Sequence, residues 1–223
     1  MGTRSFVIPD IHGCERTFNH LLKDVIRLQK TDSLYLLGDT IDRGPRSKGV
    51  IDTILNLQAE GYEVHPLRGN HEDMFLKSCC DRTYFHLWML NGGHTMLASF
   101  GVEDGCEIPL PYRSFIESWP YFIELPDFIL VHAGLNFRID DPLTDTEAML
   151  WSRDLEIDKR LLGGRKMIGG HTPFNREEIM QSLTRDRILL DNGCVYNGEP
   201  GMGSLAALEL NSMALYFQEN IDR

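Results

Sequence analysis

The chain contains 223 residues, of which 42% are hydrophobic, 25% charged and 9% aromatic, so it can bury a sizeable core and is not expected to be disordered. The 33 Asp and Glu residues outnumber the 22 Lys and Arg residues, which gives a formal net charge of −11. A chain this acidic does not hold nucleic acid or an anionic membrane by bulk electrostatics, so we expect neither as a partner. An anionic substrate would need a local concentration of positive charge.

The N-terminus and the cysteines favour a cytoplasmic protein. The first ten residues, MGTRSFVIPD, lack a signal-peptide core, and the longest apolar runs, 128–131 and 205–208, are far shorter than the roughly 18 residues of a membrane span. The five cysteines are odd in number and form no CxxC pair, so we expect reduced thiols. No cysteine has an arginine six residues later, which excludes a phosphatase with a cysteine nucleophile.

The first third of the chain alternates between strand and helix patterns. Short apolar runs predict strands at 5–9, 33–37 and 62–67, and helical spacing of apolar residues predicts helices at 15–30 and 48–60. Gly61 is placed to end the second helix. This β-α-β-α-β order predicts an α/β domain built around a sheet.

The remainder of the chain interrupts this alternation and then resumes it. Residues 72–80 and 83–100 have helical patterns, broken at Gly92-Gly93, and we expect a helical insertion over about 72–120. Further strands are predicted at 128–131, 166–168 and 187–190, followed by a hairpin of 204–210 and 214–218. We interpret the acidic stretch 140–147 as a solvated loop. No linker composition divides the chain, which predicts one domain over 1–223.

Metal-binding or acid–base residues next to glycine follow five of the predicted strands. The segments are PDIHG (9–13), GDTIDRG (38–44), RGNHE (68–72), VHAG (131–134) and GGHTP (169–173). Strand ends at one edge of an α/β sheet converge on the crevice where such folds bind ligands, and glycine lets the backbone approach a ligand closely. Each segment is a weak signal alone, but their joint occurrence predicts one site.

The donor atoms of these segments indicate a class of metal ion. The candidate ligands combine carboxylate, amide and imidazole groups, and they are Asp10, His12, Asp39, Asn70, His132 and His171. The set contains no thiolate and too much nitrogen for calcium, so it favours manganese, iron or zinc. Six ligands exceed the needs of one catalytic ion with open positions, which predicts two divalent ions about 3.5–4 Å apart, bridged by one carboxylate.

The motifs resemble those of the metallo-dependent phosphoprotein phosphatase family, whose pattern is GDxHG, GDxxDRG, GNHE, His-Ala-Gly and Gly-His. The one departure is Pro9, where the family usually has glycine. Segments 85–93 and 149–153 are similar to the small bacterial and phage branch of the family, and the resemblance covers residues 10–191. It implies a metallophosphoesterase β-sandwich of mixed sheets flanked by helices.

The resemblance also implies a role for each site residue. Asp10, His12 and Asp39 would hold one metal ion, most commonly manganese. Asp39 would bridge to a second ion, which Asn70, His132 and His171 would complete. A hydroxide bridging the two ions would attack phosphorus directly, because bound water becomes acidic.

Four further residues receive roles from the same resemblance. His71 would be the general acid that protonates the leaving oxygen, and Asp42 would hydrogen-bond its ring. Arg43 and Arg153 would bind the phosphate oxygens through forked guanidinium contacts.

Three functions remain open at this point. The first is dephosphorylation of phosphoserine and phosphothreonine, with phosphotyrosine undecided, in a phosphoprotein or phosphopeptide by a monomeric enzyme. The second is symmetrical cleavage of dinucleoside tetraphosphates such as diadenosine tetraphosphate. Enzymes of that kind typically lack an Asp at the position of Asp42 and have Asp in place of Glu72, so both residues favour the phosphatase. The third is a catalytically silent binding module, against which the complete ligand set argues.

Two other polar residues near the motifs receive a structural interpretation. We expect Arg68 to form a structural ion pair and Asp191 to lie in a turn that ends a strand.

Overall fold

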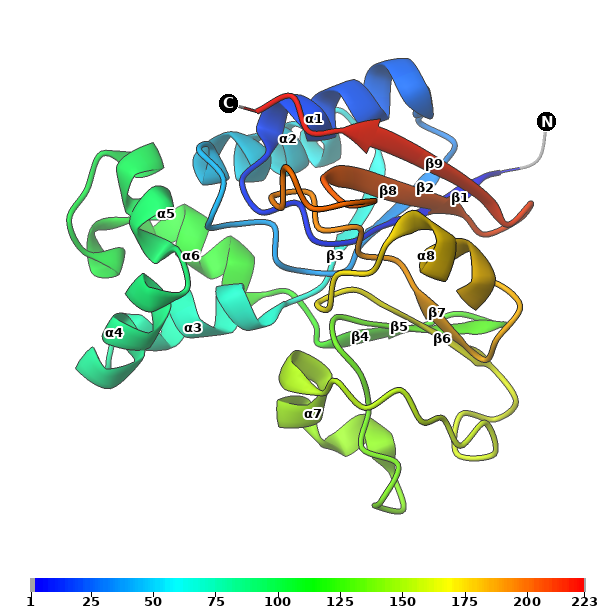
Figure 1. Ribbon diagram of the computed structural model, residues 1–223. Helices are drawn as coiled ribbons and strands as arrows, with labels where there is room; N and C mark the ends of the chain where they lie inside the picture. The colour runs from blue at the N-terminus through cyan, green and yellow to red at the C-terminus, as the bar shows by residue number, and fades with distance from the viewer. Residues whose placement is uncertain (1–2, 223) are drawn as a thin grey trace.

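The computed structural model describes residues 3–222 and contains two β-sheets surrounded by helices (Figure 1). The strands are β1 (Ser5–Ile8), β2 (Ser33–Leu36), β3 (Glu63–Pro66), β4 (Phe122–Glu124), β5 (Phe128–Val131), β6 (Lys166–Gly169), β7 (Arg187–Leu189), β8 (Ser204–Glu209) and β9 (Ala214–Glu219). The α-helices are α1 (Glu15–His20), α2 (Ser47–Ala59), α3 (Asn70–Ser78), α4 (Arg82–Leu90), α5 (Gly93–Phe100), α6 (Leu110–Glu117), α7 (Thr146–Trp151) and α8 (Arg176–Ser182).

Both sheets combine parallel and antiparallel pairs. The five-stranded sheet has the order β3-β2-β1-β8-β9, in which β1, β2 and β3 run parallel and β8 is antiparallel to both of its neighbours, β1 and β9. The four-stranded sheet has the order β4-β5-β6-β7, with β4 antiparallel at its edge. The α/β class and the mixed sheets that the sequence and its resemblance predicted are confirmed.

The inner faces of the two sheets enclose a common core. Val7, Leu37 and Leu208 from the first sheet or its strand ends are buried in one cluster with Leu130 and Ile168 of the second. Strand residues alternate between faces, so the neighbouring side chains of the same strands point outward. Outward residues of the first sheet, such as Phe6 and Ile8, pack in a separate cluster beneath the helices. The protein is therefore a sandwich with helices on its outside.

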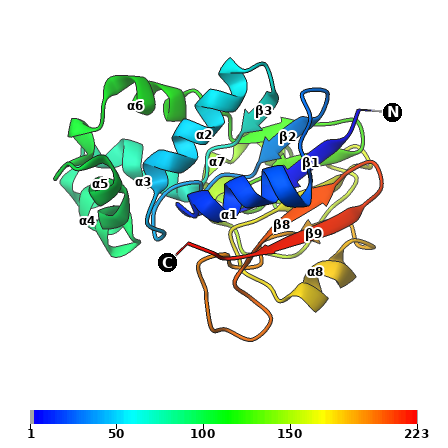
Figure 2. The ribbon, with the colours of Figure 1, turned by 90° about the horizontal axis from the view of Figure 1, so that it is seen from above.

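Helices α1 and α2 cover the outer face of the five-stranded sheet (Figure 2). Helix α2 buries Val50, Ile51 and Ile54, which the helical period places on one side. Helices α3, α4, α5 and α6 form a group at one side of the sandwich, between β3 and β4 in the chain (Figures 1 and 2). These helices occupy the region in which the sequence predicted an insertion.

Two predictions about local structure are wrong. The α-helix expected over 15–30 ends at His20 and continues only as a π-helical turn, Leu21–Val25. The Arg4 side chain donates to the carbonyl oxygens of Ile26 (3.2 Å) and Arg27 (3.1 Å), which are therefore not free to extend the helix. The stretch 140–147 is also not all loop, because it contains a 3₁₀ turn, Pro142–Thr144, and the start of α7.

The predicted strands are present, each within one residue of its expected bounds. The helix predicted at 83–100 is divided into α4 and α5 at Asn91-Gly92, beside the expected break. Strand β4 and helix α8 had no prediction. Among residues 3–222, no helix combines the length and the apolar character that crossing a membrane requires.

Candidate dimetal active site

The loops that follow β1, β2, β3, β5 and β6 bring all six candidate ligands together. None of the six side chains is more than 9% exposed. Asp10 and His12 follow β1, Asp39 follows β2, and Asn70 begins α3 directly after β3. His132 and His171 come from the other sheet. The site therefore lies where the strand ends of both sheets meet, beside the helices of the insertion (Figure 1).

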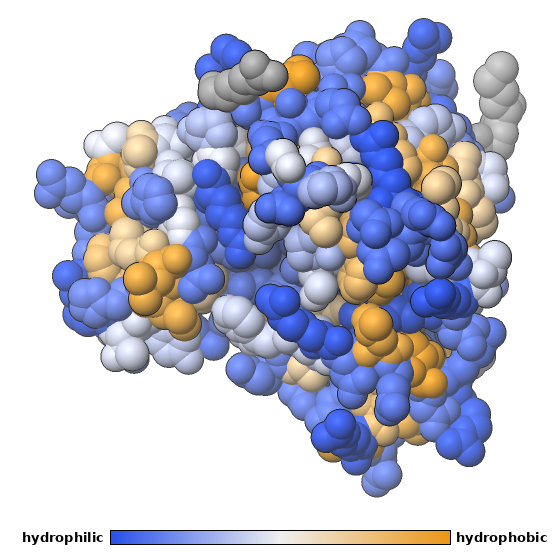
Figure 3. Space-filling model, viewed as in Figure 1, coloured by the Kyte–Doolittle hydropathy of each residue, from blue (hydrophilic) through white to orange (hydrophobic). Residues whose placement is uncertain are grey.

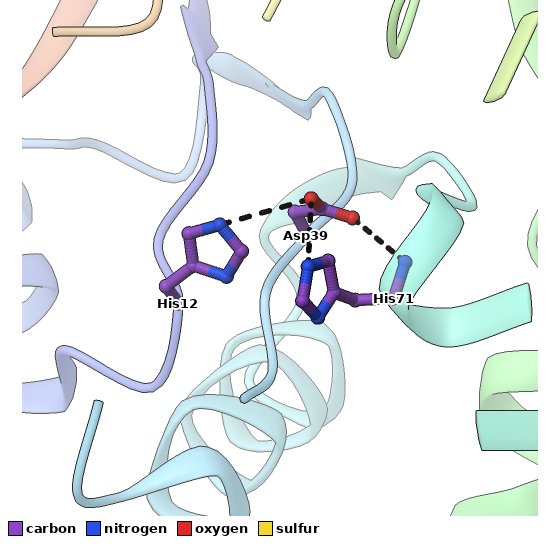
Figure 4. A group of neighbouring side chains, drawn as sticks. All are labelled: His12, Asp39 and His71. Carbon is purple, nitrogen blue, oxygen red and sulfur yellow. Dashed lines mark hydrogen bonds and ion pairs between the residues drawn. The ribbon is translucent and has the colours of Figure 1, made fainter. Parts of the chain in front are cut away.

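Asp39 is at the centre of the group (Figure 4). Its Oδ2 atom lies 3.7 Å from His12 Nε2, 3.8 Å from His71 Nε2 and 3.5 Å from His132 Nε2. Its Oδ1 atom accepts the His71 backbone N–H at 3.0 Å, which fixes the carboxylate. The position of Asp39 between the two groups of donor atoms fits a carboxylate shared by two ions.

One half of the site contains lone-pair atoms that face one another. The Nδ1–H of His132 donates to the carbonyl oxygen of Leu37 at 2.9 Å, so its Nε2 carries a lone pair. This Nε2 lies 2.9 Å from Asn70 Oδ1 and 3.1 Å from His171 Nδ1. Burial lowers the pKa of His132 well below its ordinary value, which favours the unprotonated ring. Such a cluster of buried acceptors fits a cation.

The other half of the site contains Asp10 and His12. His12 Nδ1 donates to the Ile41 carbonyl at 3.0 Å, which turns its Nε2 toward Asp10 Oδ2 at 4.0 Å. Burial lowers the pKa of His12 to about 3. Asp10 accepts the His171 backbone N–H, and a Cβ atom at Gly170 would lie 2.3 Å from its Oδ1. The glycine therefore leaves the space that this carboxylate occupies.

His71 is held by a carboxylate as well as by its position at the start of α3. Its Nδ1–H donates to Asp42 Oδ2 at 2.8 Å, and both side chains are completely buried. Its Nε2 has no hydrogen-bond partner among the described residues. The donor atoms of His12, Asp39 and His71 lie within 4.8 Å of one another, so distance alone would also allow His71 as a ligand. The pairing with Asp42 is the feature that favours an acid–base role.

The two candidate phosphate-binding arginines are exposed side chains at the rim. Arg43 Nη1 donates to His12 Nε2 at 2.8 Å, so its charged end already lies in the site. That contact uses the lone pair a metal ion would use, so the two are mutually exclusive. Arg153 follows α7 and lines a pocket of about 390 Å³ with Phe137 and Arg138. Arg153 is close enough to His171 to lower its pKa, after burial, which is the larger cause.

Two functional candidates were missed by the sequence analysis, and both act over long sequence separations. Trp88 Nε1 donates to Asp42 Oδ2 at 2.7 Å from helix α4. Arg187, only 6% exposed, donates through Nη2 to the Ala133 carbonyl at 2.8 Å and through Nη1 to the Asp154 carbonyl. It therefore links the loop of His132 to the segment after Arg153. Neither contact has a local sequence signal.

Three residues near the site act structurally. The Glu72 carboxylate accepts backbone N–H groups of Gly69, Asp39 and Thr40 at 2.8–2.9 Å and so joins two site loops. The ion pair predicted for Arg68 is wrong, because its hydrogen bonds go to the Tyr121 hydroxyl and the Glu117 carbonyl. Asp191 caps its own turn through the Gly193 N–H at 2.7 Å, as expected.

Comparison with known proteins agrees with this geometry. The family model for calcineurin-like phosphoesterases matches residues 3–204, so the chain belongs to that family and is a metallophosphoesterase. It is 28% identical over 202 residues to serine/threonine-protein phosphatase 1 of Salmonella typhimurium, covering 87% of this chain and 88% of that one. The resemblance to phosphoprotein phosphatases drawn from the motifs is thus confirmed.

Other relatives carry a different name. The chain is 26% identical over 222 residues to the asymmetrical bis(5'-nucleosyl)-tetraphosphatase PrpE of Anoxybacillus flavithermus, covering 86% of both chains. A metallophosphoesterase structure from Sphaerobacter thermophilus aligns with a TM-score of 0.58 at 18% identity, over 100% of this chain and 90% of that one. This last likeness concerns the fold alone.

Proposed function

We propose that the protein is a metal-dependent phosphomonoesterase that removes phosphate from phosphoserine and phosphothreonine in proteins. The observation that carries this proposal is the buried His71–Asp42 pair, with His71 Nε2 unpartnered beside Asp39. An alkoxide is a poor leaving group, so an alkyl phosphate needs a proton donor at the leaving oxygen. The match to the Salmonella typhimurium phosphatase supports the same choice.

The residues fit two divalent ions, held by Asp10, His12 and Asp39 on one side and by Asp39, Asn70, His132 and His171 on the other. When bound, such ions polarise the phosphoryl oxygens and acidify a water that serves as nucleophile. Manganese is the ion we propose, because mixed imidazole and carboxylate sets suit it.

The protein's own groups would bind the phosphate and supply the proton. Arg43 and Arg153 would hold the oxygens that do not react, where Arg forks are stronger than point charges. Burial lowers the pKa of His71 well below its ordinary value, so the free site holds a neutral ring with its proton on Nδ1. The charges of the substrate phosphate and of Asp42 favour a second proton on Nε2, and that proton would pass to the leaving oxygen.

The second candidate function is hydrolysis of dinucleoside tetraphosphates. The observation that favours it is the match to PrpE, which covers 86% of the chain, against 87% for the match to the phosphatase. The pocket beside Arg153, with an aromatic and a second arginine, has room for a substrate group beyond the phosphate. A catalytically silent binding module is the least favoured choice, because all six candidate ligands and the His71–Asp42 pair lie close together.

Turnover of a phosphopeptide panel beside diadenosine tetraphosphate, with manganese added, tests the proposal. We expect kcat/KM to be at least about tenfold higher for phosphoserine or phosphothreonine peptides than for the dinucleotide. Phosphotyrosine peptides in the same panel show whether phosphotyrosine is a substrate as well. A preference for the dinucleotide would contradict the proposal and select the second candidate. The products, two diphosphates or a mono- and a triphosphate, would then decide between symmetrical and asymmetrical cleavage.

A further inference from the structure

The helices beside the site contribute a side chain to its acid–base pair. Asp42 Oδ2 accepts two hydrogen bonds, one from His71 Nδ1 at 2.8 Å and one from Trp88 Nε1 at 2.7 Å. The other carboxylate oxygen, Oδ1, has no partner among the described residues. All three side chains are completely buried. Two groups therefore set the orientation of the Asp42 carboxylate. One is the His71 ring, which the carboxylate itself has to orient, and the other is the Trp88 indole of α4.

We propose that Trp88 is a positioning residue for the reaction, which fixes the Asp42 carboxylate so that Asp42 can hold the His71 ring. This inference rests on the proposed general-acid role of His71. A donor that stays in place fixes where the carboxylate lies, and the carboxylate in turn fixes the direction in which His71 Nε2 points. Burial raises the pKa of Asp42 well above its ordinary value, and the Trp88 hydrogen bond acts in the opposite direction, in favour of the carboxylate.

Trp88 is itself held in one place by its neighbours. Its ring packs against Phe75 of α3 at a centroid distance of 5.3 Å and against Phe85 at 6.3 Å. A Cβ atom at Gly93 would lie 2.5 Å from the indole, so only glycine leaves room for it. A buried side chain with this packing has one rotamer, which makes its N–H a fixed reference for the carboxylate.

The same helical segment also contacts the residue that follows Asp42. The Arg43 backbone N–H donates to the Gly92 carbonyl at 3.4 Å, in the short connection between α4 and α5. Asp42 and Arg43 both have left-handed φ angles, of 68° and 62°, which non-glycine residues rarely adopt. The connection and Trp88 together support this strained turn, so the inserted helices act on the acid and on the phosphate-binding arginine at once.

Replacing Trp88 by phenylalanine removes the N–H and leaves an aromatic ring. Trp119→Phe is the matched control, because Trp119 is 3% exposed, lies in the same core cluster, and its Nε1 has no partner among the described residues. With phenyl phosphate as substrate, we expect Trp88→Phe to lower kcat by about 10- to 100-fold, part of the contribution of a general acid. The KM should stay within about twofold and the metal content at two ions per chain. Trp119→Phe should change kcat by less than about twofold.

The leaving group separates positioning from general damage to the fold. With p-nitrophenyl phosphate, whose leaving group needs no proton, the loss in Trp88→Phe should shrink to a few-fold. In a His71→Asn background, Trp88→Phe should cause no further loss, because the residue it acts through is gone. Equal losses with both substrates, or a full additional loss in the double variant, would overturn the proposal.

A third variant is needed if the Trp88→Phe protein fails to fold. Site-specific incorporation of benzothienylalanine at position 88 keeps the shape of the ring and replaces the N–H by sulfur, and it should give the same loss in kcat. Unchanged kcat in this protein would overturn the role of Trp88 while leaving the proposed function intact. Absence of phosphomonoesterase activity in the unmodified protein with any divalent ion would instead contradict the proposed function.

Discussion

At the scale of residues, the site is a set of buried histidines in which a hydrogen bond to one ring nitrogen turns the other nitrogen into the site. His12 and His132 each donate through Nδ1 to a backbone carbonyl, so each presents a lone pair on Nε2. His71 donates through Nδ1 to a carboxylate instead, at 2.8 Å. Metal-ligating histidines donate to backbone carbonyls and to carboxylates alike. A carboxylate partner additionally favours the charged ring that a general acid needs. This difference supports separate roles for the three histidines.

Replacement of His71 by asparagine tests the acid role. We expect kcat with phenyl phosphate to fall by about 10²–10⁴, with both metal ions retained, because a general acid contributes this much. The loss should be smaller with p-nitrophenyl phosphate. Steady-state kinetics and metal analysis of the same preparation measure both effects. If the variant loses metal instead, His71 is a ligand. The distance of 3.8 Å between His71 Nε2 and Asp39 Oδ2 would then reflect a shared ion.

Arg153→Ala separates phosphate binding from metal binding. We expect two ions per chain to remain, KM to rise and kcat to fall, because a charge-assisted hydrogen bond to the phosphate is worth about 1.5–3 kcal/mol. Lysine should restore little, since it lacks the guanidinium fork. Inhibition by inorganic phosphate should weaken in parallel. Kinetic constants within about twofold of the original, with unchanged phosphate inhibition, would show that Arg153 is only a surface charge.

At the scale of elements, the site depends on glycines that let the loops and the candidate ligands approach one another closely. A Cβ atom would meet the neighbouring loop at 2.5 Å at Gly38, at 2.2 Å at Gly69 and at 2.3 Å at Gly170. Each of these glycines comes between a strand end and a candidate ligand. Gly38 therefore lets two backbone segments approach each other, and Gly69 and Gly170 leave the space that the carboxylates of Asp39 and Asp10 occupy.

Gly170→Ala tests this close approach. The new methyl group would displace the Asp10 carboxylate, whose Oδ1 is 2.3 Å from the Cβ position. We expect activity to fall by about 10²-fold, since a displacement of about 1 Å in a site has this effect, and the metal content to drop below two ions per chain. Gly61→Ala is the control, because nothing lies within 4 Å of its Cβ position. Gly61→Ala should lose some thermal stability but keep its kcat. Equal activity in Gly61→Ala and Gly170→Ala would show that the site does not depend on the space at Gly170.

Local patterns were sufficient to predict most elements that carry the site. The strands before Asp10, Asp39 and His132 are short apolar runs, and the motifs directly after them placed the ligands in one crevice. Contacts between distant segments could not be predicted in this way. The end of the helix at His20 depends on Arg4, and the hydrogen bond from Trp88 to Asp42 spans 46 residues. Helical period contains no information on either contact.

At the scale of the whole molecule, this acidic protein has basic side chains close to the candidate ligands. The net charge is −11, yet Arg43, Arg153 and the buried Arg187 are all close enough to His171 to help burial lower its pKa. Figure 3 shows a largely hydrophilic surface, with hydrophobic patches over the inserted helices, where Leu87, Leu90 and Leu110 are exposed. Because the net charge is negative, the protein as a whole does not attract an anionic substrate over a long range. Binding of the phosphate therefore depends on short-range contacts with the arginines and on the metal ions.

Burial of so many carboxylates predicts a coupling between metal binding and protons. Burial raises the pKa of Asp191 to about 6. Burial, followed by the charge of Asp191, raises the pKa of Asp10 well above its ordinary value. In the metal-free protein both carboxyl groups therefore keep their protons to a higher pH than exposed ones, and a cation favours their ionised forms. Manganese binding should release protons between about pH 5 and 7, and its affinity should rise with pH there. Calorimetry in buffers of different ionisation enthalpy measures the release, and a pH-independent affinity without release would contradict the prediction.

Hydrolysis at a dimetal centre would depend on the six candidate ligands, which are Asp10, His12, Asp39, Asn70, His132 and His171. This dependence is tested most directly by reconstituting exhaustively chelated protein with Mn²⁺ and following hydrolysis of an aryl phosphate against the number of ions bound. We predict no turnover without metal, recovery that is complete at two ions per chain, and weaker recovery with Mg²⁺, because imidazole ligands favour the softer ion. Full activity in the chelated protein would contradict the account.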